Sequence, residues 1–336
     1  MKTIGHKRAI QSLRNAEQKG RLAHAYLLTG PSQIGKTTLA IDVACMVNCQ
    51  QSKKPCGECG PCKRILQKIH ADVKIIRVSS AEGRTGNRFS IGIDQIRQLE
   101  KEANLKPFEG ICRVFIVEET HLMSSEAANA LLKTLEEPPD QVLILLLSSE
   151  AHTIPVTVVS RCQQIDMHPI AADMIYDHIK SAAQLDDARI KEIAYAAYGR
   201  MGWAIQVIDQ REMFDKRQKI IDRFEELLTS PLNLKFSYVE ELASKQNIYR
   251  DEMFNELRLL QLWFRDMLML YVGSPNLVVN YTRIDSLLPI SESLSHTEMI
   301  RAIKDIDHSI NLLKINVGAR LVLEQLMLRL PIPQSK

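Results

Sequence analysis

An eight-residue glycine loop near the start of the chain constrains the fold more than any other feature of the sequence. It reads Gly30-Pro31-Ser32-Gln33-Ile34-Gly35-Lys36-Thr37. The apolar run at residues 25–28 precedes this loop and a helical pattern at residues 37–47 follows it, which is the strand–loop–helix context of a phosphate-binding loop. Glycines let backbone N–H groups approach phosphates, and the helix N-terminus adds partial positive charge. We therefore expect an α/β domain that binds a nucleotide.

Two side chains at the end of the loop have distinct predicted roles. Lys36 is expected to reach the β- and γ-phosphates, and the hydroxyl of Thr37 is expected to ligate Mg²⁺. The predicted cofactor is accordingly ATP with Mg²⁺. The predicted nucleotide-binding residues of this segment are Gly30, Pro31, Gln33, Ile34, Gly35, Lys36, Thr37 and Thr38.

A second apolar strand is predicted at residues 113–117, and it ends in the paired acids Glu118 and Glu119. In phosphate-loop proteins such a strand brings one acid to the Mg²⁺ shell, and a neighbouring acid can activate the attacking water. The first acid is usually aspartate, whereas Glu118 is one methylene longer. We expect both carboxylates near the nucleotide, and the sequence leaves open whether they support hydrolysis.

Four cysteines follow the helix of the glycine loop at the spacing Cys49-x6-Cys56-x2-Cys59-x2-Cys62. Tight Cys-x-x-Cys turns can direct several sulfurs to one ion, and Zn²⁺ accepts four thiolates in closed structural sites. We therefore predict a structural zinc site, with an iron–sulfur cluster and a redox pair as alternatives. His70 is either a spare ligand or a surface residue. The odd total of seven cysteines argues against a disulfide framework.

The rest of the sequence indicates several domains, because 336 residues exceed one ordinary core. Strands and helices continue to alternate, which favours a parallel sheet covered on both faces: residues 73–78 (strand), 93–103 (helix), 125–135 (helix) and 142–147 (strand). Ser124 is placed to cap the helix that follows it. The expected domains are an α/β domain at 1–167 with the cysteine module at 49–62, a small helical domain at 168–210 and a larger helical domain at 211–336.

Composition argues against several classes of function. The formal net charge of +3 argues against a strongly basic nucleic-acid binder, and the 5% aromatic content argues against a stacking platform for bases. No apolar run approaches the roughly 18 residues of a membrane span, and the N-terminus lacks a signal-peptide pattern. We expect a cytoplasmic protein without a membrane partner.

Taken together, these segments resemble the bacterial clamp-loader ATPase family. Besides the glycine loop and the four cysteines, three stretches carry the resemblance: residues 20–27 (GRLAHAYL), residues 129–139 (NALLKTLEEPP) and Ser160-Arg161-Cys162. The likeness covers the first 165 residues and continues more weakly through residues 316–330. It implies a phosphate-loop domain of the AAA+ class with a zinc-binding insertion, a helical lid and an all-α collar that holds the subunits in a ring.

The resemblance also implies roles for further residues. Arg161 matches an arginine finger that reaches the γ-phosphate bound by a neighbouring subunit and stabilises charge on the transferring phosphoryl group. Ser149 matches the polar residue that senses the γ-phosphate, with Ser148 as the competing choice. The implied partners are loader subunits of the gamma/tau and delta types, and transiently the sliding clamp and primer-template DNA.

Two departures from the family pattern favour a stator subunit over a motor subunit. The first is Glu118, and the second is Gly202, which stands where the motor ATPases place an arginine that touches the nucleotide. Arg200, two positions earlier, would lie on roughly the opposite helix face. The motor type also carries an extra N-terminal segment and often a long tail, which this sequence lacks. We therefore expect a stator that binds ATP, hydrolyses it weakly or not at all, and offers Arg161 to its neighbour.

Two alternatives remain at this point. The chain could be a motor ATPase that turns over its own nucleotide. It could also be a nucleic-acid-binding module, because Lys53, Lys54, Lys63 and Arg64 flank the cysteines and can contact phosphates. Such charges more often form a solvated rim, so we rank the module last.

Overall fold

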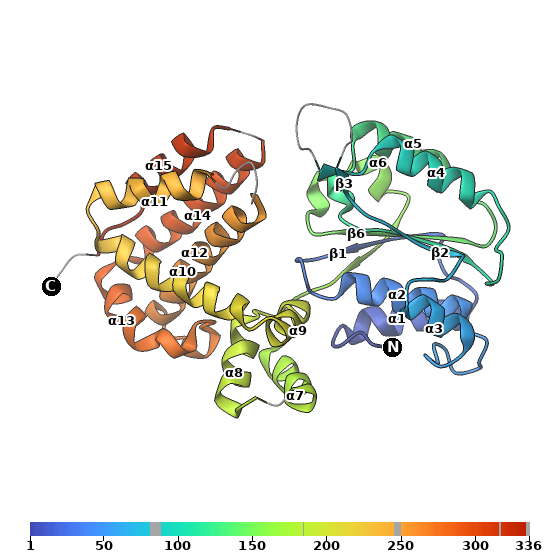
Figure 1. Ribbon diagram of the computed structural model, residues 1–336, viewed down its shortest axis with the longest axis horizontal. Coiled ribbons are helices and arrows are strands. Elements are labelled where there is room, and N and C mark those ends of the chain that lie inside the picture. Colours follow the sequence, from blue (N-terminus) through green and yellow to red (C-terminus); the bar gives the residue numbers. More distant parts are fainter. Residues whose placement is uncertain (81–88, 184, 245–249, 316, 334–336) are drawn as a thin grey trace. The chain divides into compact units, whose positions relative to one another are not determined.

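The computed structural model describes residues 1–80, 89–183, 185–244, 250–315 and 317–333 (Figure 1). The chain divides into two compact units. The first contains Met1–Met174 with Gly199–Trp203, and the second contains Ile175–Tyr198 with Ala204–Lys336. The three-part division at residues 167 and 210 stays a prediction. Among the described helices, none has both the length and the apolar character that a membrane crossing requires.

The first unit is built on a parallel sheet of five strands in the order β2-β5-β6-β1-β7. The strands are β1 (Ala25–Thr29), β2 (Val73–Ile76), β5 (Arg113–Val117), β6 (Val142–Ser148) and β7 (Gln163–Asp166). The register pairs Leu28 with Leu147 and Ile76 with Val117. Because all the pairs are parallel, the carboxyl ends of the strands lie along one edge of the sheet, where open α/β sheets bind their ligands.

Helices cover both faces of this sheet (Figure 1). One face carries α1 (Lys7–Gln18), α2 (Lys36–Asn48) and α3 (Gly60–Leu66), and the other carries α4 (Ile93–Ala103), α5 (Ser125–Glu136) and α6 (Val156–Val159). Side chains alternate between the faces along each strand, so Leu28 and Ile116 belong to one core while Leu27 and Phe115 belong to the other. With both faces covered, every residue of β5 and β6 is buried.

Short elements complete the first unit. They are an antiparallel pair, β3 (Ser79–Ser80) with β4 (Phe89–Ser90), and the 3-10 helices η1 (Thr120–Leu122) and η2 (Ala151–Thr153). The predicted helix at residues 93–103 and strand at residues 113–117 are confirmed with the same bounds. The cap at Ser124 is also confirmed, because its Oγ accepts a hydrogen bond from the N–H of Ala127 at 3.1 Å. The strand predicted at residues 73–78 ends earlier, at Ile76.

The second unit is helical. Its helices are α8 (Asp187–Ala196), α10 (Glu212–Thr229), α11 (Leu232–Ser244), α12 (Arg250–Tyr271), α13 (Ile284–Ser293), α14 (His296–Lys314) and α15 (Ala319–Arg329), with the short η3 (Pro275–Leu277) and η4 (Tyr281–Arg283). The division between the units falls within α7 (Ala172–Ala182) and α9 (Met201–Asp209). α12 forms the centre of the core, since Trp263, Phe264 and Met267 are completely buried.

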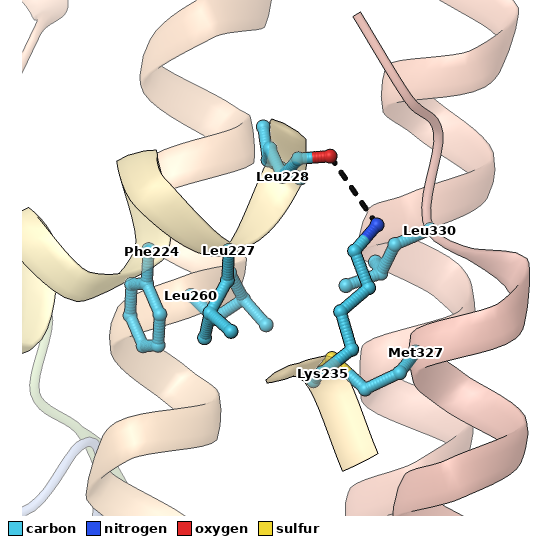
Figure 2. Close-up of a pocket in the computed structure, with 7 residues that line it drawn as sticks. All are labelled: Phe224, Leu227, Leu228, Lys235, Leu260, Met327 and Leu330. Carbon is cyan, nitrogen blue, oxygen red and sulfur yellow. Dashed lines mark hydrogen bonds between the residues drawn. The ribbon is translucent and has the colours of Figure 1, made fainter. Parts of the chain in front are cut away.

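A buried lysine lies in the apolar core of this helical unit (Figure 2). Lys235 of α11 lines a small pocket together with Phe224, Leu227, Leu228, Leu260, Met327 and Leu330. Its Nζ donates a hydrogen bond to the carbonyl oxygen of Leu228 at 3.2 Å. That carbonyl belongs to the last turn of α10, where helix carbonyls lack intrahelical partners and favour a positive charge. Burial lowers the pKa of Lys235 from its ordinary value of 10.5.

We predict that Lys235 makes stability depend on pH. The folded protein releases the Lys235 proton at a lower pH than the unfolded chain does. Between the two pKa values the unfolded chain therefore binds more protons, and the free energy of unfolding rises with pH. Lys235→Met removes this contribution. Denaturant titrations at about pH 7 and about pH 10 should show wild type gaining stability relative to the variant at the higher pH.

Lys219→Met is the matched control for this measurement. Lys219 is an exposed lysine of α10, so Lys219→Met removes a lysine and leaves the buried Lys235 in place. The control variant should follow the wild-type pH dependence. If Lys235→Met and Lys219→Met show the same pH dependence, the buried lysine does not titrate as predicted.

Candidate nucleotide site and metal centre

The glycine loop connects β1 to α2, and its backbone is closely packed. Gly30 has a φ of 140°, and a Cβ there would lie 2.2 Å from the carbonyl oxygen of Met167, so only glycine fits. The N–H of Gly30 donates to the carbonyl oxygen of Ser148 at 3.2 Å. Gly35 has a φ of 112°, and open space lies where its Cβ would be. α2 begins directly after Gly35, so a phosphate can approach the unpaired N–H groups of the first helical turn.

Lys36 is buried within this loop. Its Nζ donates hydrogen bonds to the carbonyl oxygens of Gly30 at 2.7 Å and Pro31 at 2.9 Å. Burial lowers the pKa of Lys36, and the charge of Glu119 opposes that shift. Ile34 anchors the same loop in the apolar core. The ammonium thus braces the loop and lies where phosphate oxygens can replace the two carbonyls as acceptors.

Glu118 lies against the first turn of α2. The hydroxyl of Thr37 donates to Glu118 Oε1 at 3.0 Å, while Arg77 Nε donates to Glu118 Oε2 at 2.8 Å. Thr38 follows Thr37 in the same helical turn. The structure therefore brings the predicted acid to the predicted Mg²⁺ ligand. No sequence pattern marks Arg77, which occupies the other side of the carboxylate.

Glu119, the second predicted acid, lies at the same edge of the sheet beside Ser149 and His121. Glu119 Oε2 is 3.5 Å from the hydroxyl of Ser149 and 3.4 Å from His121 Nε2. Ser148 is fully buried, and its hydroxyl accepts a hydrogen bond from the N–H of Glu150 at 3.0 Å. Ser149, rather than Ser148, therefore contacts the exposed acid.

Gly202, at the start of α9, contacts the glycine loop through its backbone. Its N–H donates to the carbonyl oxygen of Gln33 at 2.8 Å, and a Cβ at Gly202 would lie 2.8 Å from that same oxygen. A larger residue would push the helix away from the loop. Arg200 instead faces Trp203, with its guanidinium carbon 5.8 Å from the ring centre. At this position the chain therefore makes a backbone hydrogen bond to the glycine loop, whereas the motor ATPases of the family are expected to place an arginine side chain there.

Arg161 follows α6 and is oriented by neighbours within the chain. Its Nη2 lies 2.6 Å from Glu136 Oε1 at the end of α5. Its Nη1 donates to the carbonyl oxygen of Thr157 at 2.9 Å. The side chain is 35% exposed, so the guanidinium is both anchored and reachable from solvent. No sequence pattern marks Glu136 as its partner.

The four predicted metal ligands converge on one point. The sulfur atoms of Cys49, Cys56, Cys59 and Cys62 all lie within 4.8 Å of one another, and the pairs Cys49–Cys59 and Cys56–Cys62 are 4.0 and 3.9 Å apart. Four thiolates at about 2.3 Å from one Zn²⁺ ion are about 3.8 Å apart, so the group fits a tetrahedral ion. The N–H groups of Cys59 and Glu58 donate to the Cys56 sulfur and lower the pKa of Cys56 to about 6.

Residues around the cysteines are tied to acids of the same chain. His70 is buried, which contradicts the expected surface position, and its Nε2 lies 3.6 Å from Glu109. Lys54 forms an ion pair with Glu17 at 2.9 Å, and Arg64 forms one with Glu109 at 2.6 Å. Two of the four flanking basic side chains are thus already neutralised, which weakens the nucleic-acid-module interpretation.

We predict that the purified chain carries one Zn²⁺ ion per molecule. Cys59→Ser should release the ion, because a closed structural site needs all four thiolates. It should also lower the free energy of unfolding, since metal binding is linked to folding. Elemental analysis combined with denaturant titration measures both effects. Cys162→Ser, at a partly buried cysteine outside the group, should keep the metal, and iron in place of zinc would contradict the prediction.

Three comparisons with known proteins can be set beside this geometry. Residues 5–171 match the protein-family model described as "DNA polymerase III, delta subunit". The chain is 32% identical over 306 residues to the DNA polymerase III subunit tau of Bacillus subtilis, covering 84% of this chain and 52% of that protein. It is 33% identical over 213 residues to the DNA polymerase III subunit gamma of Buchnera aphidicola, covering 61% of this chain and 56% of that protein.

The chain spans about half the length of these two curated relatives. A solved structure, a DNA polymerase III gamma subunit-related protein from Thermotoga maritima, aligns with a TM-score of 0.41 at 17% identity over 96% of this chain and 99% of that one. The family model and the sequence relatives are all named as subunits of DNA polymerase III, which supports the clamp-loader family without distinguishing among its subunits.

Proposed function

We propose that this chain is the delta-prime subunit of a bacterial DNA polymerase III clamp loader. In this role it helps to load the sliding clamp onto primer-template DNA in an ATP-dependent manner. It is the stator of a cytoplasmic complex that also contains gamma/tau and delta subunits. It donates Arg161 to the nucleotide site of a neighbouring ATPase subunit, and it binds ATP itself with weak or no hydrolysis.

The state of Arg161 is the observation that carries this proposal. An arginine that acts in trans has to be accessible and oriented before the neighbour's phosphate arrives. The ion pair with Glu136 and the hydrogen bond to Thr157 orient the guanidinium, while a third of the side chain is exposed. A charge supplied in this way to a transferring phosphoryl group accelerates its transfer by several powers of ten.

The chain's own nucleotide site supports binding more than turnover. The glycine loop has the open backbone and the buried lysine that phosphates require. Glu118, in contrast, shares its two oxygens between Thr37 and Arg77, so an arginine already engages the carboxylate that is expected to help hold Mg²⁺. Gly202 offers the loop a backbone N–H instead of a cation. With Mg²⁺ bound, Thr37 and Glu118 are the side chains that would hold the ion.

The proposed role of Zn²⁺ is structural. Cys49 ends α2 and Cys59 precedes α3, so one ion joins the ends of two helices that cover the same face of the sheet. Cys49 and Cys62 are buried with the apolar core of that face. Metal binding therefore stabilises the fold of the first unit rather than forming a binding surface for a partner.

The alternative is a gamma/tau-type motor ATPase. The complete glycine loop favours it, and the curated relatives described above carry the names tau and gamma. The two proposals differ in which residue of this chain matters for turnover by the assembled loader. A motor needs Lys36 for its own site, whereas a stator needs Arg161 for its neighbour's site.

We predict that DNA-stimulated ATP turnover by the reconstituted loader depends on Arg161 of this chain and little on Lys36. Arg161→Ala should lower turnover by at least about tenfold at the site that the arginine completes, since a positive charge at the phosphoryl group is lost. Lys36→Ala should leave turnover nearly unchanged. The readout is steady-state phosphate release with primer-template DNA and sliding clamp present.

Arg97→Ala is the control for loss of an exposed arginine. Arg97 lies on α4 with its side chain 61% exposed and pairs with Asp94 at 4.0 Å, so turnover should stay at the wild-type level. Loss of a full site's share of turnover in Lys36→Ala would establish the motor alternative. No effect of either Arg161→Ala or Lys36→Ala would show that neither residue lies at an active interface of the loader.

A further inference from the structure

Arg77 lies beside the acid at the end of β5, and the strand register fixes it there. β2 and β5 pair in parallel with Ile76 opposite Val117, so the residues that follow, Arg77 and Glu118, leave the sheet side by side. The N–H of Glu118 donates to the carbonyl oxygen of Ile76 at 2.9 Å. The side-chain amide of Gln95 donates to the carbonyl oxygen of Arg77 at 2.8 Å. Both backbone segments are therefore held in place by hydrogen bonds.

The Arg77 guanidinium completes an arrangement of three side chains. Glu118 accepts a hydrogen bond from Thr37 on Oε1 and one from Arg77 on Oε2, at 3.0 and 2.8 Å. A threonine or serine hydroxyl and an acid are the protein ligands of Mg²⁺ in phosphate-loop proteins. The positive charge of Arg77 is thus already paired with Glu118, the acid that would help Thr37 to hold Mg²⁺.

We propose that Arg77 takes over the charge role of the divalent cation in this site, so that nucleotide phosphates bind here with little dependence on Mg²⁺. The inference rests on the proposed binding of ATP by the glycine loop. Arg77 neutralises Glu118, whose charge would otherwise repel the phosphates. A guanidinium also keeps its charge at every accessible pH, and its planar set of N–H donors suits phosphate oxygens.

The same arrangement explains why binding and hydrolysis separate. A divalent cation polarises the phosphoryl oxygen and orients the leaving group. An arginine bonded to Glu118 removes the repulsion between that acid and the phosphates, but it does not polarise the phosphoryl group or activate a water molecule. Nucleotide therefore stabilises the loop in this subunit without committing it to turnover.

The test is a nucleotide-binding titration of the full chain in two buffers. Binding of a fluorescent ATP analogue is followed by anisotropy, once with excess Mg²⁺ and once in buffer prepared free of divalent cations without a chelator, so that the cysteine centre keeps its metal. The wild-type Kd should change by less than about threefold between the buffers. The Kd of Arg77→Gln should rise at least about tenfold when Mg²⁺ is left out.

Two further variants separate charge from structure. Arg77→Lys keeps the positive charge and should retain most of the Mg²⁺ independence. Arg97→Gln removes an exposed positive charge on α4 and should behave as wild type. Both variants are checked for folding by circular dichroism.

The outcomes distinguish this inference from the function on which it rests. If wild type binds the analogue only with Mg²⁺, the role assigned to Arg77 is wrong and ATP binding stands. If Arg77→Gln is as independent of Mg²⁺ as wild type, that role is wrong as well. If wild type binds the analogue in neither buffer, this subunit does not bind ATP, and both the proposed ATP binding and the role of Arg77 are wrong.

Discussion

The convergence of three strand ends on Gly30 holds the candidate site together. β1 lies between β6 and β7, and Gly30 is hydrogen-bonded to the carbonyl oxygen of Ser148, while a Cβ at this position would clash with the carbonyl oxygen of Met167. A side chain at this position would separate the strand ends. The glycine therefore fixes the loop relative to Ser149, which follows β6. It also fixes the loop relative to β7, the strand that begins two residues after Arg161. The loop and the proposed arginine finger thus share one rigid frame.

Charge at this edge of the sheet is balanced within the chain. Lys36 and Arg77 supply two positive charges, and Glu118 and Glu119 supply two negative ones. Each acid is engaged by protein groups, Glu118 by Thr37 and Arg77 and Glu119 by Ser149 and His121. The two acids therefore do not leave this edge with a net negative charge that would repel phosphates.

Much of this arrangement could be predicted from the sequence because the strongest signals are local. The glycine loop, the cysteine spacing and the largely apolar strands β5 and β6 are each complete within a short segment. β7 has no comparable signal, because its sequence QQID is polar and it lies at the edge of the sheet. Arg77 and Glu136 escape prediction for a different reason. Glu118, the partner of Arg77, lies 41 positions further along the chain, and Arg161, the partner of Glu136, lies 25 positions further along. Only strand register and helix packing bring these residues together.

The ion pair between Arg161 and Glu136 is weak enough to be exchanged. Both side chains are partly exposed, at 35% and 50%, and exposed ion pairs contribute about 0–1 kcal/mol. A phosphate group from a neighbouring subunit carries more negative charge than one carboxylate, and burial at an interface strengthens its attraction. Under the proposed function, Glu136 therefore orients the guanidinium without locking it. The hydrogen bond from Arg161 to Thr157 engages a different nitrogen, Nη1 rather than Nη2, so it can persist after the carboxylate is released.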